Sequence, residues 1–564
     1  MTPDSAPSLL SKLAAAHGVG TIGPAGAAVP EESVRLVLEA LGVPASTDGE
    51  VRLSLETHHA QWRPLPSVVA ARAGRSQRVP GWVPEGFEPT AFVTTAGGRE
   101  RAARVEVSAG RGRLTGGDRV VRVTVVVPGD LPVGQHLLTL DFEWSGVSVP
   151  LFVAPQVFPA LSRPGVRWGL GGATHEIPTS GPGKGSEVSD TPGSPDLADL
   201  AELVSWVGAD LDGDFVLWDP ASASGGPYAD PLWVRPAQVP EHAGLDESGR
   251  AVVASGRRRE ALRALYAVPR SPRRQRAFES FCVAGGQSLL DHATWLAITA
   301  RYGPDPQRWE PALRDAGSEE VARLREADAV DVNFHRWCQW VADEQLAEAA
   351  REATRSGMGL GLVVGLHAPG AVPGSEAWAH GSLPVEGVRV GRPPGPRSAS
   401  GEVGEAAPWS PAVLRDLGFA PLTRRLGVVS RHAAGMVLRR PEEWFRQWWV
   451  PEGLPAGAGT WVAQDSEALL AAVGIAAHRH GTVVMLDADG DGLGAPETQW
   501  LVGQGVLPLV DGSTGATPVE RQSAAAQPLR WVDVAELANG KALSVRSLAA
   551  SPQARRRARP HLSG

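Results

Sequence analysis

The chain has 564 residues, a hydrophobic content of 43%, a charged content of 21% and a net charge of -8. This composition is that of a globular protein large enough for several domains, or for one large barrel with additions. Because the negative charge is spread along the chain, nucleic acid and anionic membranes are excluded as main partners.

The N-terminal part of the chain is expected to be helical and then to change to strands. Residues 8–17 and 31–41 carry apolar residues at helical spacing, and Gly42-Val43-Pro44 stops the second helix. Residues 119–127 are a run of β-branched residues, and residues 134–142 partly alternate. We therefore expect a helical region over residues 1–48 and a β-sandwich domain over residues 49–158.

Strands and helices alternate in the remainder, residues 159–564. Helices are expected at 196–207, 289–301, 333–356 and 466–480, and strands at 214–218, 359–364 and 482–486. Repeated strand-then-helix order indicates a parallel sheet, and at this length an α/β fold of the (β/α) barrel type, complete or incomplete. Segments 178–195 and 391–408 are rich in Gly, Pro and Ser and are expected to be flexible loops.

Several weaker patterns resemble ion-binding or phosphate-binding motifs but are better explained as turns, loops and buried side chains. Asp487 to Gly492 starts like a calcium loop, but the twelfth position is Thr498 instead of glutamate, which favours an acidic turn. Gly181 to Ser186 lacks the spacing of a phosphate loop. We expect Cys282 and Cys338 to be reduced, partly buried thiols. No metal-ligand spacing links His175, His335, His432 and His478. We therefore expect no metal and no cofactor.

Two motifs carry a family resemblance. Residues 334–346 read FHRWCQWVADEQL, and residues 444–453 read WFRQWWVPEG. Both are similar to motifs of the 4-alpha-glucanotransferases (amylomaltases) of high-GC bacteria, which read FHRWLQWxxDEQL and LFRLWWIPEG. Shorter matches at 16–19, 34–43, 196–201, 214–217 and 230–236 fall in the same order along the chain. The resemblance implies maltodextrin or glycogen metabolism and binding of α-1,4-glucan or maltooligosaccharide. It identifies no protein partner.

The resemblance also implies a reaction that needs several carboxylates. A retaining glycosyl transfer uses a nucleophile and an acid/base about 5 Å apart, at the C-terminal ends of barrel strands. In the family's nucleophile motif, GGLRIDH, the aspartate position corresponds here to Arg439. A guanidinium cannot attack an anomeric carbon, so this substitution is non-functional for catalysis.

The other catalytic motifs are altered as well. The acid/base glutamate of VVGEDLG corresponds to Asp487, or to Asp491 if the alignment shifts. The stabiliser motif, THDLPxT, has no counterpart, since no His-Asp pair follows residue 490, and the aspartate of the upstream HDLAVGV motif corresponds to Gly365. Sites that face a glucan are lost, whereas framework residues such as Trp337, Trp340, Trp448 and Trp449 remain and are expected to pack in the core.

Three hypotheses follow. The first is a catalytically inactive or impaired member that binds or regulates in glucan metabolism. The second is an active 4-alpha-glucanotransferase with a rebuilt site that uses Asp487 and other carboxylates. The third is a scaffold that binds a protein or an anion through Arg439 and Arg440. The first is preferred. The chain lacks a secretory signal or an apolar span, so a cytoplasmic location is expected.

Overall fold

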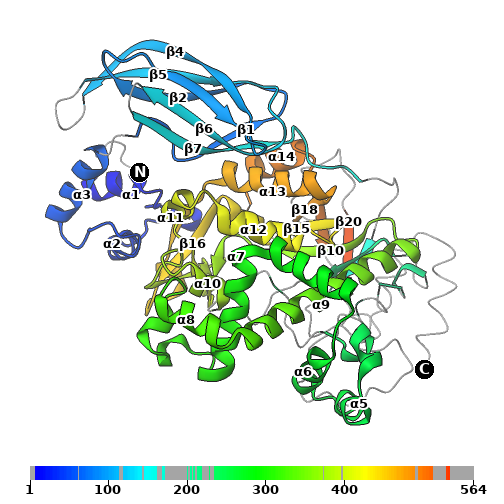
Figure 1. Cartoon of the computed structure of the whole chain (residues 1–564). Coiled ribbons are helices and arrows are strands. Elements are labelled where there is room, and N and C mark those ends of the chain that lie inside the picture. Colours follow the sequence, from blue (N-terminus) through cyan, green and yellow to red (C-terminus); the bar gives the residue numbers. More distant parts are fainter. Residues whose placement is uncertain are drawn as a thin grey trace.

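The computed structural model describes the chain in several ranges (Figure 1). These ranges are 7–60, 63–113, 119–142, 145–161, 168–171, 200, 204–205, 207–209, 213–218, 228, 234–371, 374–395, 398–488, 493–511 and 529–533. The expected loop at 178–195 lies outside them, as do residues 489–492 of the acidic turn expected at 487–492, which include Asp491. Most of the helix expected at 196–207 and His175 also lie outside them.

The N-terminal helices pack on a small sheet that comes from much later in the chain. Helices α1 (Leu9–Ala16), α2 (Glu31–Ala40) and α3 (Asp48–Ala60) confirm the expected helical character of this region. The sheet has the order β13-β12-β16-β17, from Glu402–Val403, Val388–Arg392, Arg446–Pro451 and Thr460–Ala463. Leu13, Val37, Val388 and Trp449 share one buried cluster, which joins the two segments.

The β-sandwich is confirmed. Seven strands form one strongly curled sheet in the order β1-β7-β6-β3-β4-β5-β2. The long strand β4 pairs with β3 in one half and with β5 in the other, with an irregularity between Val107 and Arg111. Alternating inward residues from both halves fill the core. The strands are β1 (Val69–Arg72), β2 (Gln77–Pro84), β3 (Thr90–Thr94), β4 (Glu100–Arg113), β5 (Arg119–Val127), β6 (Gly134–Phe142) and β7 (Ser145–Ala154).

The expected (β/α) barrel is also confirmed, and it closes. Seven parallel strands follow one another in chain order, and β20 pairs with β8 to complete the ring. Of the two forms left open by the sequence, complete and incomplete, the described strands therefore show a closed barrel. They are β8 (Trp168–Gly171), β9 (Phe215–Trp218), β10 (Gly361–Leu366), β15 (Gly435–Leu438), β18 (Val483–Asp487), β19 (Leu507–Asp511) and β20 (Leu529–Asp533).

Helix α13 (Ser466–His480) connects the sandwich to the barrel. It packs against β1 and β7 on one side and contributes to the core outside β15 and β18 on the other. In Figure 1 it lies between the sandwich above and the barrel strands below. The helix ends at Gly481, whose φ of 67° is in the left-handed region that glycine adopts at helix C-termini.

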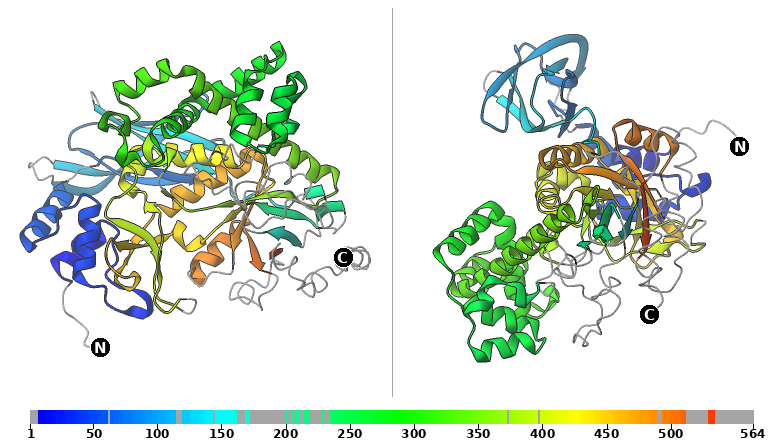
Figure 2. Two further views of the ribbon diagram at one scale, coloured as in Figure 1. Left: turned by 90° about the horizontal axis from the view of Figure 1, so that it is seen from below. Right: turned by 90° about the vertical axis from the view of Figure 1, so that its right-hand side faces the viewer.

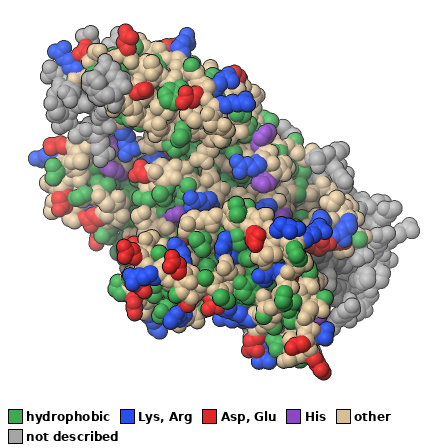
Figure 3. All heavy atoms as spheres, in the orientation of Figure 1, with side chains coloured by type: hydrophobic (Ala, Val, Ile, Leu, Met, Phe, Trp, Pro, Cys, Tyr) green, Lys and Arg blue, Asp and Glu red, His purple; other side chains and the backbone are tan. Residues whose placement is uncertain are grey.

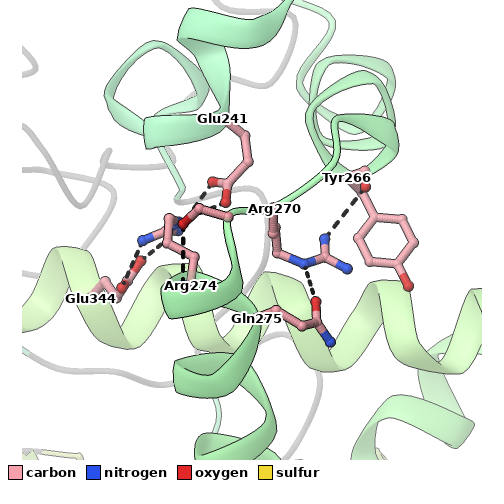
Figure 4. Close-up of polar contacts among 7 residues, drawn as sticks. Glu241, Tyr266, Arg270, Arg274, Gln275 and Glu344 are labelled. Atoms are coloured by element: carbon pink, nitrogen blue, oxygen red, sulfur yellow. Dashed lines mark hydrogen bonds and ion pairs between the residues drawn. The ribbon is translucent and has the colours of Figure 1, made fainter.

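The helices that come between β9 and β10 in the sequence form a lobe outside the barrel. The right-hand view of Figure 2 shows this lobe in green, as a separate layer. Its long helices α7 (Pro272–Tyr302) and α9 (Ala329–Arg355) pack side by side. Arg274 of α7 joins them by reaching Glu344 of α9 at 3.0 Å and the buried Glu241 at 2.6 Å, as drawn in Figure 4. The lobe also contains α5 (Glu247–Ala254), α6 (Arg258–Ala267) and α8 (Glu319–Ala327).

The segment 391–408 differs from the expected loop. It contains the end of β12, all of β13 and the short strand β14 (Ala407–Pro408), which pairs with β11 (Gly370–Ala371). Its glycines approach neighbouring backbone closely: a Cβ on Gly404 would lie 2.6 Å from the carbonyl oxygen of Val390. The Gly-rich composition here therefore reflects tight packing of backbone. The domain limits at 48/49 and 158/159 remain predictions.

The surface shows no large area of one charge on the side in view. Figure 3 shows Lys and Arg interspersed with Asp and Glu over most of this face. Among the described residues, no helix is both long enough and apolar enough to span a membrane.

Candidate active site at the barrel mouth

The C-terminal ends of the barrel strands form one mouth, where the active sites of such barrels lie. Register places three polar residues of consecutive strands in one row: Leu366 pairs with Leu438 and Leu438 with Leu486, so His367, Arg439 and Asp487 come next in line. Side chains alternate along a strand, and Val363, Val437 and Met485 belong to the cluster inside the barrel. The row therefore continues the inward face.

Arg439 lies directly after β15 and its guanidinium pairs with Asp487. The distance from Arg439 Nη1 to Asp487 Oδ2 is 3.1 Å, and the two side chains are 24% and 22% exposed. The backbone N–H of Arg439 donates to the carbonyl of Leu366 at 2.9 Å, which continues the strand pairing by one residue. The residue expected at the nucleophile position thus bonds to the residue expected at the acid/base position.

Glu443 is a buried carboxyl that the sequence alone did not single out. Arg440, with a φ of 47°, turns the chain sharply into the short helix η7 (Pro441–Trp444), and its guanidinium lies 2.5 Å from Glu443 Oε1. Burial raises the pKa of Glu443 to about 7, while Arg440 and the nearby His367 act in the opposite direction. A carboxyl with this pKa could exchange a proton near neutral pH. Its only sequence signal is its position four residues after Arg439.

Two further aspartates end barrel strands. Asp511 is the last residue of β19 and Asp533 is the last residue of β20, so the backbone brings both to the same mouth as Asp487. Neither aspartate matches the stabiliser motif THDLPxT, because neither is preceded by histidine. Gly365 lies within β10 and offers no side chain.

Several of the other residues singled out in the sequence are buried in the protein core. Trp337, Trp340, Trp448 and Trp449 are buried, which confirms their packing role. Cys282 and Cys338 are free and buried, and burial raises the pKa of both thiols. Burial likewise lowers the pKa of His335 to about 4. Among the described residues, no group of three or more His, Cys, Asp or Glu is placed to hold a metal ion.

Comparison with known proteins supports the resemblance. A family model of 4-alpha-glucanotransferases matches residues 245–495, and a model of the MalQ N-terminal beta sandwich domain matches residues 64–155. The 4-alpha-glucanotransferase of Mycobacterium tuberculosis (strain H37Rv) is 30% identical over 517 residues, covering 83% of this chain and 69% of that protein. The chain belongs to the 4-alpha-glucanotransferase family.

Other members of the 4-alpha-glucanotransferase family match less closely in sequence. The Haemophilus influenzae 4-alpha-glucanotransferase is 27% identical over 238 residues, or 40% of this chain and 34% of that protein. Amylomaltase from Corynebacterium glutamicum has the same fold, with a TM-score of 0.76 at 24% identity, covering 98% of this chain and 84% of that one. Amylomaltase from Streptococcus agalactiae in complex with acarbose has a TM-score of 0.52 at 13% identity, over 66% and 90% of the two chains.

Proposed function

We propose that this member of the 4-alpha-glucanotransferase family does not catalyse retaining transfer and acts in glucan metabolism by binding α-1,4-glucan in a regulatory role. One observation supports the proposal above all. At the barrel mouth, where the family resemblance predicts a carboxylate nucleophile, a guanidinium is ion-paired to Asp487 at 3.1 Å.

The chemistry of a retaining transfer explains why this pair matters. The nucleophile must form a covalent bond to the anomeric carbon, and arginine stays protonated and offers no lone pair for that attack. The transition state resembles an oxocarbenium ion, so a fixed positive charge beside it raises the barrier. Asp487 is engaged by the same guanidinium and is one methylene shorter than the glutamate of the family motif.

Incubation with maltotriose tests the absence of transfer. The products would be separated by chromatography, with the Mycobacterium tuberculosis relative as a control for the assay. We expect unchanged maltotriose with this chain. Glucose together with longer maltooligosaccharides would contradict the proposal.

Calorimetry with maltoheptaose tests the binding part separately. Heat of binding with a defined stoichiometry supports a glucan-binding protein. Absence of binding at millimolar maltoheptaose would contradict it and favour the scaffold hypothesis, in which Arg439 and Arg440 meet a protein or an anion.

An active 4-alpha-glucanotransferase is the second candidate. It is favoured by Asp511 and Asp533, which end neighbouring strands at the mouth that also holds Asp487. These residues would supply the carboxylates of a rebuilt site. This alternative predicts disproportionation of maltotriose that is lost in Asp487→Asn, Asp511→Asn and Asp533→Asn.

A further inference from the structure

A cavity of about 280 Å³ lies on the outer wall of the barrel, away from the mouth. Its floor contains Leu362 and Val364 of β10, which belong to the cluster outside the barrel together with α9. Ala433, which also lines it, lies two residues before β15. The walls come from α7, α9 and α12 (Ala420–Val429), which lie next to one another in Figure 1. The cavity thus lies towards the N-terminal ends of β10 and β15.

Positive charge dominates this cavity. Three arginines line it, Arg424, Arg431 and Arg479, and Asp343 is the single acidic residue among the described residues that line it. Asp343 accepts from Arg431 Nη1 at 2.9 Å, and His432 Nε2 lies 3.0 Å from the same oxygen. Arg431 also lies over the ring of Phe281, with its guanidinium carbon 5.6 Å from the ring centre. Arg431 is therefore held in place before any ligand arrives.

The other two guanidinium groups are available to a ligand. Arg424 of α12 and Arg479 at the end of α13 are exposed at the rim, and neither has a hydrogen-bond or ion-pair partner among the described residues. Arginine is suited to phosphoryl groups because its planar fork donates two parallel hydrogen bonds.

Neutral hydrogen-bonding groups also line the cavity, beside apolar side chains. Ser288 and Thr423 supply hydroxyls, and Tyr228 donates to Ser288 at 3.2 Å. Helix α7 breaks beside the cavity at Gly286, whose φ of 51° and ψ of -143° interrupt the helix next to Gly285. The Thr423 hydroxyl donates to the carbonyl of Ala420 at 3.1 Å, so its oxygen can accept from a ligand. A phosphate dianion at the arginines would leave these hydroxyl groups and an apolar floor for a small polyol.

We propose that this cavity binds a small phosphorylated sugar, with Arg424, Arg431 and Arg479 on the phosphoryl group and the hydroxyl side chains on the sugar. The site is separate from the proposed glucan site, because none of His367, Arg439 and Asp487 lines it. The two proposals can therefore fail independently.

Gly427 provides a way to block the cavity without disturbing the fold. It lines the cavity from α12, and a Cβ at this position would meet nothing within 4 Å. Gly427→Leu is expected to fill the cavity, and Gly427→Ala is the matched control that adds one methyl group. Both replace glycine in a helix, so both should keep or raise the melting temperature.

Calorimetry with glucose 6-phosphate tests the proposal on the full chain. We expect binding that Gly427→Leu abolishes, that Gly427→Ala retains, and that Arg424→Gln with Arg479→Gln weakens by roughly tenfold or more. Maltoheptaose binding by Gly427→Leu should equal that of the unmodified chain. Glucose and inorganic phosphate each carry one half of the ligand and should each bind more weakly than glucose 6-phosphate.

Three results would overturn the proposal. One is no binding of glucose 6-phosphate by the unmodified chain. Another is binding that Gly427→Leu leaves unchanged, because the ligand would then bind elsewhere. The third is that inorganic phosphate binds as tightly as glucose 6-phosphate. The cavity would then recognise the phosphoryl group alone and not the sugar.

Discussion

Arg439, directly after β15, and Asp487, the last residue of β18, form an ion pair at the barrel mouth. Each side chain is about one quarter exposed, so solvent partly screens their attraction. Either residue alone would leave a half-buried charge among His367 and the strand ends. The pair is therefore expected to contribute to stability.

A double-mutant cycle over Arg439→Ala and Asp487→Ala measures that contribution. We expect a coupling energy of about 1 kcal/mol, because the pair is partly exposed. Urea unfolding of the four proteins gives the value. A coupling of zero would show that the two charges do not interact in solution.

Glu443 gives stability a pH dependence of unusual sign for a carboxyl group. Burial raises its pKa to about 7 from an ordinary 4.5. Between these values the folded protein keeps a proton that the unfolded chain releases, so this group lowers stability as pH rises from 4.5 through 7. Glu443→Gln removes the ionisation and is expected to stabilise the protein by up to about 3 kcal/mol at pH 8, with little effect at pH 4.5. Thermal unfolding at both pH values checks this, and an equal effect at both would contradict it.

Sequence reasoning reached Arg439 but not the cluster around the outer cavity. Arg439 could be placed by counting back from Trp448 and Trp449 within one motif. Arg431, His432 and Asp343 meet across 88 and 89 residues of sequence. No local sequence pattern predicts such a contact, because it depends on how α9 packs against the segment before β15.

At the scale of elements, Arg274 is an ionic link between α7 and α9 in addition to their apolar packing. Arg274 binds Glu241, whose side chain is 2% exposed, and Glu344, which is 37% exposed (Figure 4). It also lies over Trp340, with its guanidinium carbon 4.3 Å from the ring centre. Removal of the cation would leave the buried Glu241 without its counter-charge.

Arg274→Ala is therefore expected to destabilise the protein by roughly 3 kcal/mol. Glu344→Gln is the matched control and should cost less than about 1 kcal/mol, because that carboxylate is more exposed. Chemical unfolding followed by circular dichroism compares the two. Equal losses would show that Glu241 finds another partner.

The element boundaries show where periodicity is informative. The expected helix 289–301 is the second half of α7, which begins at Pro272. The first half was missed because Gly285 and Gly286 interrupt the pattern at the kink. The expected strands 359–364 and 482–486 are β10 and β18 within two residues, since strands buried on both faces appear as apolar runs.

At the scale of the whole molecule, the sandwich and the barrel followed from the order of predicted elements and from the family resemblance. Barrel closure did not, because β20 lies in a segment without motif matches. The contact of the N-terminal helices with β16 and β17 could not be predicted either, because it joins the beginning of the chain to residues 446–463.

The central claim is that this barrel has no working nucleophile. Release of fluoride from α-maltotriosyl fluoride tests it most directly, because fluoride leaves with little acid assistance and the assay then depends on nucleophilic attack. With a fluoride electrode, we expect the rate with this chain to equal that of buffer alone, while the Mycobacterium tuberculosis relative releases fluoride. Fluoride release above the buffer rate, lost on substitution of Asp511 or Asp533, would contradict the account.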